Sequence, residues 1–161
     1  MKEAIQTLIT SDKMAHAFEY LKQDEAHTID QQIELVQISS FSPFEEKRAI
    51  RFKELLTEAD LDPVMDEVHN VYAHIHGTGN GPTLYVSAHL DTVFPPETPL
   101  PVKREGTKIY APGIGDDTRG LAEILTLARA IKESGLKPVG DIIIGGNVGE
   151  EGLGDLRGMR H

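Results

Sequence analysis

The sequence predicts an α/β fold in which a mixed, largely parallel sheet is flanked by helices. Residues 71–76, 82–88 and 142–148 have the composition of strands, and helical patterns precede and separate them. Strands and helices that alternate in this way are typical of a sheet with helices packed on its faces. Three consecutive isoleucines at 142–144 indicate a strand buried on both faces, as strands of parallel sheets tend to be. At 161 residues, the chain is long enough for one domain with a sizeable core.

The first quarter of the chain is predicted to be helical. Ser11 or Asp12 is a suitable N-cap for a first segment, because both side chains can accept a hydrogen bond from the first turn. The apolar positions of this segment are Met14, Ala17, Phe18 and Leu21. A second helical pattern places three apolar residues on one face, Ile29, Ile33 and Val36.

A further helix is predicted to begin in Ser42-Pro43-Phe44-Glu45 and to end near Ala59. Ser42 would be its N-cap, Pro43 its first helical residue and Glu45 the acid that completes a capping box. Its apolar positions are Ala49, Phe52, Leu55 and Leu56.

A half-buried strand is predicted after Pro63, where apolar residues at 71, 73 and 75 alternate with Tyr72, His74 and His76. The two histidines fall on its polar side, so we expect exposed rings with only adventitious metal affinity. The glycine-rich residues 77–81 are predicted to form a turn. No Lys-Ser or Lys-Thr pair follows this turn, which argues against a phosphate-binding loop.

Prolines at 95, 96, 99 and 101 predict that residues 94–106 form an extended loop, and a short strand is expected at 108–111. An amphipathic helix then precedes the last strand, and Gly135 and Pro138 end it. The apolar positions of this helix are Leu121, Ile124, Leu125, Ala128 and Ile131.

Composition excludes several classes of function. The net charge of −10 argues against nucleic acid or an anionic membrane as a partner, because either requires a basic surface. The chain has no cysteine, so disulfides and thiolate ligands are excluded and any metal must be held by His, Asp and Glu. The start of the chain lacks the apolar segment of a secretory signal, and no run is long enough to span a membrane. We therefore expect a cytoplasmic protein.

Imidazole and carboxylate side chains gather after two predicted strands and before the long helix. The pairs are His89 with Asp91, Asp116 with Asp117, and Glu150 with Glu151. Sites in open α/β sheets form beyond the carboxyl ends of strands, so we expect the three loops to meet. Carboxylates brought together repel one another and require protons or cations. Neutral imidazole and carboxylate oxygens suit Zn²⁺, with Mn²⁺ or Co²⁺ as alternatives.

Each pair also has a purely structural interpretation. His89 alone is more typical of a hydrogen-bonded buried histidine, and Asp116 with Asp117 is as typical of a helix N-cap as of a ligand. The two glutamates alone would be solvated surface. In an extended chain, Asp91 points the same way as His89 and can accept the second imidazole N–H, which orients the ring. The arrangement of all three pairs in glycine-rich loops favours the metal site.

Three successive motifs resemble the signatures of the M20 metallopeptidases, which include tripeptidase T and acetylornithine deacetylase. They are SAHLDTVFP at 87–95, APGIGDDTRG at 111–120 and GNVGEEGLG at 146–154. The resemblance runs from about Asp30 onward and implies a zinc-exopeptidase-like fold with two zinc ions. It also implies a cis peptide bond between Asp116 and Asp117.

The resemblance implies a role for five of these residues. His89 would be a terminal ligand of one zinc ion, with Asp91 as the carboxylate behind it. Asp116 would bridge both ions, and Glu151 would be a terminal ligand of the second. Glu150 would be the general base that takes a proton from water and passes it to the leaving amine.

The chain departs from the family pattern because only ten residues follow Glu151. The family's remaining terminal ligands, an acid and a late histidine, come further along the chain. We therefore expect residues 1–29 to be a helical extension and residues 30–161 to be the N-terminal part of a catalytic domain, without the lid or dimerisation domain and the C-terminal part. With two protein ligands for each ion, the chain alone is expected to be inactive or nearly so.

The leading hypothesis is a metallopeptidase that hydrolyses short peptides. An N-acyl amino acid deacylase of the same family is an alternative, and an M28-type aminopeptidase ranks lower because its first signature usually differs from His-x-Asp-Thr-Val. A non-catalytic domain that self-associates as a homo-oligomer is the alternative from a different class, because a partial domain exposes sheet edge and apolar surface.

Overall fold

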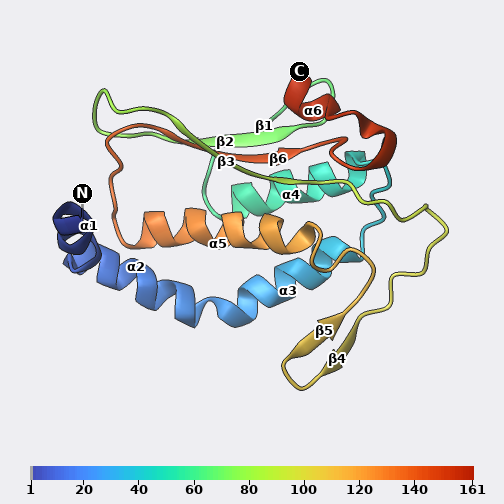
Figure 1. The fold of residues 1–161 in the computed structure, drawn as a ribbon, viewed down its shortest axis with the longest axis horizontal. Coiled ribbons are helices and arrows are strands. Elements are labelled where there is room, and N and C mark those ends of the chain that lie inside the picture. Colours follow the sequence, from blue (N-terminus) through green and yellow to red (C-terminus); the bar gives the residue numbers. More distant parts are fainter. Residues whose placement is uncertain (1) are drawn as a thin grey trace.

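The computed structural model describes residues 2–161 and arranges them in three layers (Figure 1). A four-stranded sheet forms the first layer. Helices α4 (Glu46–Glu58) and α5 (Thr118–Glu133) pack beneath it as the second layer. Helices α2 (Asp12–Gln23) and α3 (Glu25–Val36) pack on the other side of α5 as the third. The remaining N-terminal helix is α1 (Lys2–Ile9).

The sheet has the order β1-β2-β6-β3 and is mixed, which confirms the predicted α/β class. Its strands are β1 (Val64–Met65), β2 (Val71–Ile75), β3 (Leu84–His89) and β6 (Ile142–Asn147). The parallel pair is β3 with β6, whereas β2 runs antiparallel to both β1 and β6. His89 lies opposite Asn147, so the carboxyl ends of β3 and β6 lie side by side.

The core lies between the sheet and the second layer. Val71, Ala73 and Ile144 are fully buried and belong to one apolar cluster with Phe52 of α4 and Leu125 of α5. The alternation in β2 is confirmed, because Val71 and Ala73 are buried while His74 is exposed. Burial of these apolar side chains is the main favourable term that holds the helices to the sheet.

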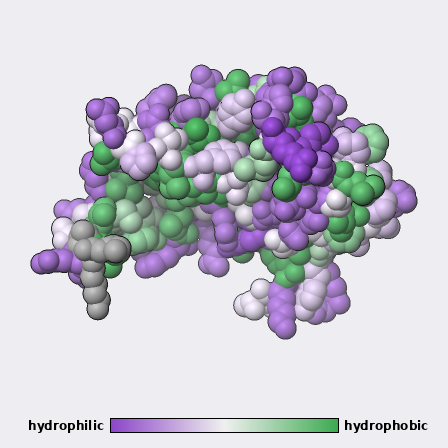
Figure 2. Space-filling view, turned by 45° about the horizontal axis from the view of Figure 1, so that its top comes forward, coloured by the Kyte–Doolittle hydropathy of each residue, from purple (hydrophilic) through white to green (hydrophobic). Residues whose placement is uncertain are grey.

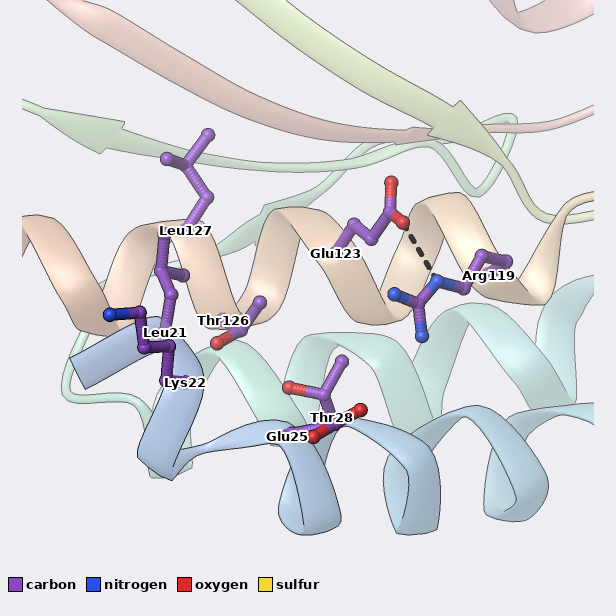
Figure 3. Close-up of a pocket in the computed structure, with 8 residues that line it drawn as sticks. All are labelled: Leu21, Lys22, Glu25, Thr28, Arg119, Glu123, Thr126 and Leu127. Carbon is purple, nitrogen blue, oxygen red and sulfur yellow. Dashed lines mark hydrogen bonds and ion pairs between the residues drawn. The ribbon is translucent and has the colours of Figure 1, made fainter. Parts of the chain in front are cut away.

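The N-terminal helices are fastened to α5 by polar contacts. Ser11 caps α2 by accepting a hydrogen bond from the Met14 N–H at 3.4 Å. Asp24, between α2 and α3, accepts hydrogen bonds from Thr126 Oγ1 at 2.7 Å and from Arg129 Nε at 3.0 Å. Figure 3 shows a pocket between these helices, in which Arg119 pairs with Glu123.

The predicted start of α4 is wrong, because the helix begins at Glu46 and its N-cap position is Glu45. The Ser42–Pro43 peptide bond is cis, and the Phe44 N–H donates to the Phe41 carbonyl at 2.6 Å, so residues 41–44 form a turn. The Glu45 side chain is fully buried and bonds to residues beyond β6 instead of forming a capping box.

Residues 103–105 were expected to lie in a loop but form strand β4 (Lys103–Glu105), which pairs with β5 (Lys108–Tyr110). The last of the four prolines in this loop is Pro101, so none falls within β4. The strand forms through hydrogen bonds to β5, which the residues of β4 alone do not indicate. This hairpin projects from the body of the protein in both the ribbon and the space-filling view (Figures 1 and 2). Strand β1 was not predicted either.

A short 3-10 helix, η1 (Gly152–Gly154), and helix α6 (Arg157–Arg160) follow β6. Hydrophilic side chains cover much of the face in Figure 2, with smaller hydrophobic patches between them. Among residues 2–161, no helix is both long and apolar enough to cross a membrane.

Candidate metal centre

His89 ends β3, and its ring faces the loop before α5. Its Nε2 lies 2.8 Å from Asp116 Oδ1. Its Nδ1 lies 3.0 Å from the backbone carbonyl of Asp91 and 3.6 Å from that residue's carboxylate. The second ring nitrogen therefore contacts the backbone of Asp91 more closely than the side chain that the sequence singled out. Either contact holds the ring with Nε2 pointing toward Asp116.

Asp91 joins the β3 loop to the loop after β6. Its carboxylate is fully buried and accepts hydrogen bonds from two successive backbone N–H groups, those of Glu150 at 3.0 Å and Glu151 at 2.8 Å. Sequence reasoning did not find this contact, because nothing local to Asp91 indicates a partner about sixty residues away. Asp91 therefore contacts both the His89 ring and the backbone of the loop that carries Glu151.

The two residues of the Asp116–Asp117 pair take different positions. Asp117 is the N-cap of α5, where it accepts a hydrogen bond from the Gly120 N–H at 2.9 Å and another from the His89 N–H at 3.2 Å. Asp116 leaves three quarters of its side chain exposed. The peptide bond between them is cis, as the family resemblance implies. The N-cap interpretation therefore describes Asp117, while Asp116 faces the imidazole.

The three predicted metal ligands come together. His89, Asp116 and Glu151 each offer one ligand atom, and these atoms lie within 4.8 Å of one another. Glu150 is exposed and adjoins this group in sequence, and Asp91 lies behind it. The structure thus assembles an imidazole and two carboxylates at the carboxyl ends of β3 and β6, a donor set that fits a divalent metal ion.

The charges of this group raise or lower the pKa values of its members. Burial lowers the pKa of His89, but hydrogen bonds to Asp91 and Asp116 and the negative charges of Asp91 and Asp117 outweigh it and raise the pKa to about 9. Burial raises the pKa of Glu151, and the nearby negative charge of Asp116 adds to this effect. A bound cation would relieve that repulsion, which is a second way in which these residues fit a metal.

The pKa of Asp91 is lowered, in contrast to those of His89 and Glu151. Burial alone would raise its pKa, but hydrogen bonds from His89 and from the backbone of Glu150 and Glu151 lower the net value. The carboxylate therefore stays ionised beside the imidazole.

Glu45 accepts hydrogen bonds from residues on both sides of the Glu150–Glu151 loop. One oxygen accepts a hydrogen bond from the Gly149 N–H at 3.1 Å, and the other accepts from Arg157 Nη2 at 2.9 Å. Arg157 belongs to α6, so Glu45 fixes both ends of the segment that carries Glu151. Sequence reasoning placed this acid in a capping box, because its partners lie more than one hundred residues away.

Arg48 supports the β3 side in a similar way. It is almost fully buried, and its guanidinium donates to the carbonyls of Leu90 at 2.9 Å and of Ile38 at 2.7 Å. Ser40 Oγ donates to the same Leu90 carbonyl at 2.8 Å. These contacts hold the chain between His89 and Asp91.

Comparisons with known proteins agree with this geometry. The family model of peptidase family M20/M25/M40 matches residues 85–161, which contain all three motifs. The chain is therefore related to the M20 peptidases. It is 38% identical over 84 residues to carboxypeptidase G2 of a Pseudomonas species, an alignment that covers 51% of this chain and 20% of that protein.

Solved structures of M20-like peptidases have the same fold. Aminopeptidase PepT of Bacillus cereus superposes with a TM-score of 0.65 at 26% identity, over 76% of this chain and 36% of its own. A tripeptidase of Staphylococcus aureus superposes with a TM-score of 0.64 at 30% identity, over 78% and 37%. The chain thus spans about a third of these structures and a fifth of carboxypeptidase G2.

The pocket of Figure 3 is separate from this site. Residues of α2 and α3, among them Leu21 and Thr28, face Arg119 and Thr126 of α5 across it. None of the predicted ligands lines it.

Proposed function

We propose that the chain is the part of an M20-type hydrolase that contributes His89, Asp116, Glu150 and Glu151 to the cleavage of peptide bonds in short peptides. The observation that supports this most is the convergence of three ligand atoms from three loops within 4.8 Å. The match to the M20 family model over the same residues supports the reaction class.

The metals would be two divalent ions, with zinc as our first choice and manganese or cobalt as alternatives. His89 and Asp116 would hold one, and Asp116 and Glu151 the other. Bound ions of this kind polarise a carbonyl and lower the pKa of water. Residues 1–161 offer each ion two protein ligands in this scheme, so we expect weak binding and little or no hydrolysis by the chain alone.

Glu150 is the general base of this proposal. Its side chain is exposed, while its own N–H is bound to Asp91, which keeps the backbone of the glutamate pair fixed. It accepts a proton from the attacking water and returns it to the nitrogen of the leaving amine. Asp91 acts through Glu150, Glu151 and His89 and holds them in position.

The substrate would lie in a hollow beside Glu151. Phe41, Pro43 and Val93 form part of its lining, and Leu153 and Arg157 line it on the side of α6. A mostly apolar hollow next to a metal site suits an uncharged side chain of a short peptide.

Substitution of Glu150 tests the function most directly in a longer chain that supplies the remaining ligands. Glu150→Gln should lower kcat by about 10²- to 10⁴-fold, the range typical of a general base, and leave the metal content unchanged. His89→Ala should lower the metal content as well. Normal turnover by the Glu150→Gln protein would overturn the assignment.

The same assay separates peptidase from deacylase. Both reactions cleave an amide bond, so the proposed site serves either, and the tripeptidase and carboxypeptidase relatives favour peptides. We expect faster hydrolysis of a tripeptide than of an N-acetyl amino acid. The reverse order would favour the deacylase.

A further inference from the structure

We propose that His74, His76 and Asp141 form a second metal-binding site, for a divalent transition-metal ion such as Zn²⁺, Ni²⁺ or Cu²⁺. The sequence alone indicates two exposed histidines on one side of the strand predicted at 71–76. The structure adds a carboxylate, because Asp141 stands immediately before β6, the strand that pairs with β2. This inference does not depend on the proposed function.

The three side chains lie within reach of one ion. Each offers one ligand atom, and the three atoms lie within 4.8 Å of one another. The two imidazole rings have centroids 5.8 Å apart, and His76 Nδ1 lies 3.6 Å from Asp141 Oδ2. Both rings are exposed, so small side-chain rotations can shorten these separations to those of a metal site. Two imidazoles and one carboxylate are a ligand set that zinc accepts, with water in the fourth position.

Asp141 is held in place for this role. Its Oδ1 accepts a hydrogen bond from the Gly77 N–H at 2.8 Å, which leaves Oδ2 facing His76. At known metal sites, a hydrogen-bond donor outside the ligand set orients the ligating carboxylate. The Gly77 N–H has this role for Asp141.

The backbone around the cluster is firmly connected. Thr78 N–H donates to the Pro138 carbonyl at 2.9 Å, and Gly79 N–H donates to the Val139 carbonyl at 3.0 Å. The turn after β2 and the loop before β6 are therefore joined directly beside the cluster. Gly77 and Gly81 allow this close approach, since a Cβ at either position would come within 2.6 Å of the backbone of Val139 or Gly140. A rigid backbone lowers the entropic cost of binding an ion.

The second site is distant from the first. Asp141 precedes the first residue of β6, whereas His89 lies opposite the last one, Asn147. Six residues of strand separate the two ends, or about 20 Å at the usual rise per residue. A metal at the second site would therefore stay clear of the substrate and would link β2 to the loop before β6.

Zinc titration followed through the imidazole resonances of each histidine in NMR spectra tests the proposal. His16 is exposed and belongs to neither ligand group among the described residues, so it reports the affinity of an isolated surface histidine. We expect the resonances of His74 and His76 to shift together, at zinc concentrations well below those that affect His16. Their shifts should persist in His89→Ala, which separates this site from the first.

Two variants sharpen the test. Loss of an outer-shell partner weakens metal binding by about 10- to 100-fold, and loss of a ligand should weaken it at least as much. We expect a weakening of this order in Asp141→Asn, whose amide oxygen can still accept from Gly77 and preserve the loop. His74→Ala should abolish the response of His76. The proposal is overturned if His74 and His76 respond only with His16, or if Asp141→Asn binds zinc as the wild-type protein does.

Discussion

Asp91 has a wider role than the orientation of one histidine. Its buried carboxylate accepts from two N–H groups of the Glu150–Glu151 loop and faces the imidazole of His89. One side chain thus sets the distance between a proposed ligand on β3 and another after β6. Removing its charge should affect both loops.

Asp91→Asn should lower the pKa of His89 from its value of about 9 in the metal-free protein. The amide supplies less negative potential and leaves one of the two backbone N–H groups without a good acceptor. An unsatisfied buried donor of this kind costs about 1–3 kcal/mol of stability. NMR titration of the His89 ring and urea unfolding measure the two effects, and an unchanged ring pKa would contradict the account.

The raised pKa of His89 also predicts how the stability of the metal-free protein depends on pH. The folded state holds a proton on His89 up to about pH 9, whereas an unfolded histidine loses it near its ordinary pKa of 6.5. The folded protein binds more protons in this interval, so its stability falls as the pH rises from 6.5 to 9. Urea unfolding at several pH values should show this fall in the wild-type protein and a smaller one in His89→Gln.

The segment from Gly149 to α6 depends on Glu45, at the start of α4. Glu45→Ala would leave the Gly149 N–H and the Arg157 guanidinium without their acceptor, at a cost of about 1–3 kcal/mol. Because Glu151 lies within this segment, zinc binding at the first site should weaken too. Glu46→Ala removes a neighbouring acid that is largely exposed and serves as the control. Equal stability and zinc affinity of the two variants would show that Glu45 has no supporting role.

The N-terminal helices depend on Asp24 for their attachment to α5. Burial raises the pKa of Asp24, but hydrogen bonds from Thr126 and Arg129 outweigh it and lower the net value below 3.8. Its stabilising contribution is therefore complete above about pH 4 and is lost as the pH falls through the lowered pKa.

Asp24→Asn should destabilise the protein by about 1–3 kcal/mol at neutral pH and by less in acid. Asp30→Asn makes the same chemical change at an exposed ion pair with Arg104 and should change stability little. Thermal unfolding at pH 7 and pH 3 compares them. A loss in Asp24→Asn that is equal at both pH values would contradict this assignment.

Elements with a strong local pattern were predictable from the sequence. Helix α5 follows its apolar period, and β2 follows its alternation. Features without a local pattern were not predictable. Strand β4 exists through its pairing with β5, and Glu45 is buried against residues more than one hundred positions away, Gly149 and Arg157. The features of the candidate sites also differ in whether the sequence alone indicated them. The residue types of His89, Asp116 and Glu151 indicated a metal, whereas the contacts of Asp91 and the presence of Asp141 beside His76 required the fold.

Strand β3 lies at the edge of the sheet in the strand order of the described residues. Leu84 and Tyr85 on this strand are 56% and 41% exposed. An exposed apolar edge strand can pair with another chain, which supports the expectation of self-association. We propose that β3 is the part of the surface where this occurs.

Leu84→Lys should reduce self-association, because a charge on an edge strand opposes pairing. Val139→Lys introduces the same charge at an exposed apolar residue outside the strands and should have little effect. Light scattering across a range of protein concentrations compares the variants. A wild-type protein that stays monomeric at all concentrations would contradict the prediction.

We propose that His89, Asp116 and Glu151 act together as one metal-binding group. Calorimetric zinc titration of a protein that carries His74→Ala and His76→Ala isolates this group from the second proposed site. We expect measurable zinc binding that is lost or severely weakened when His89→Ala or Glu151→Gln is added, and retained when His16→Ala is added. Zinc binding that is unchanged by both His89→Ala and Glu151→Gln would contradict the account.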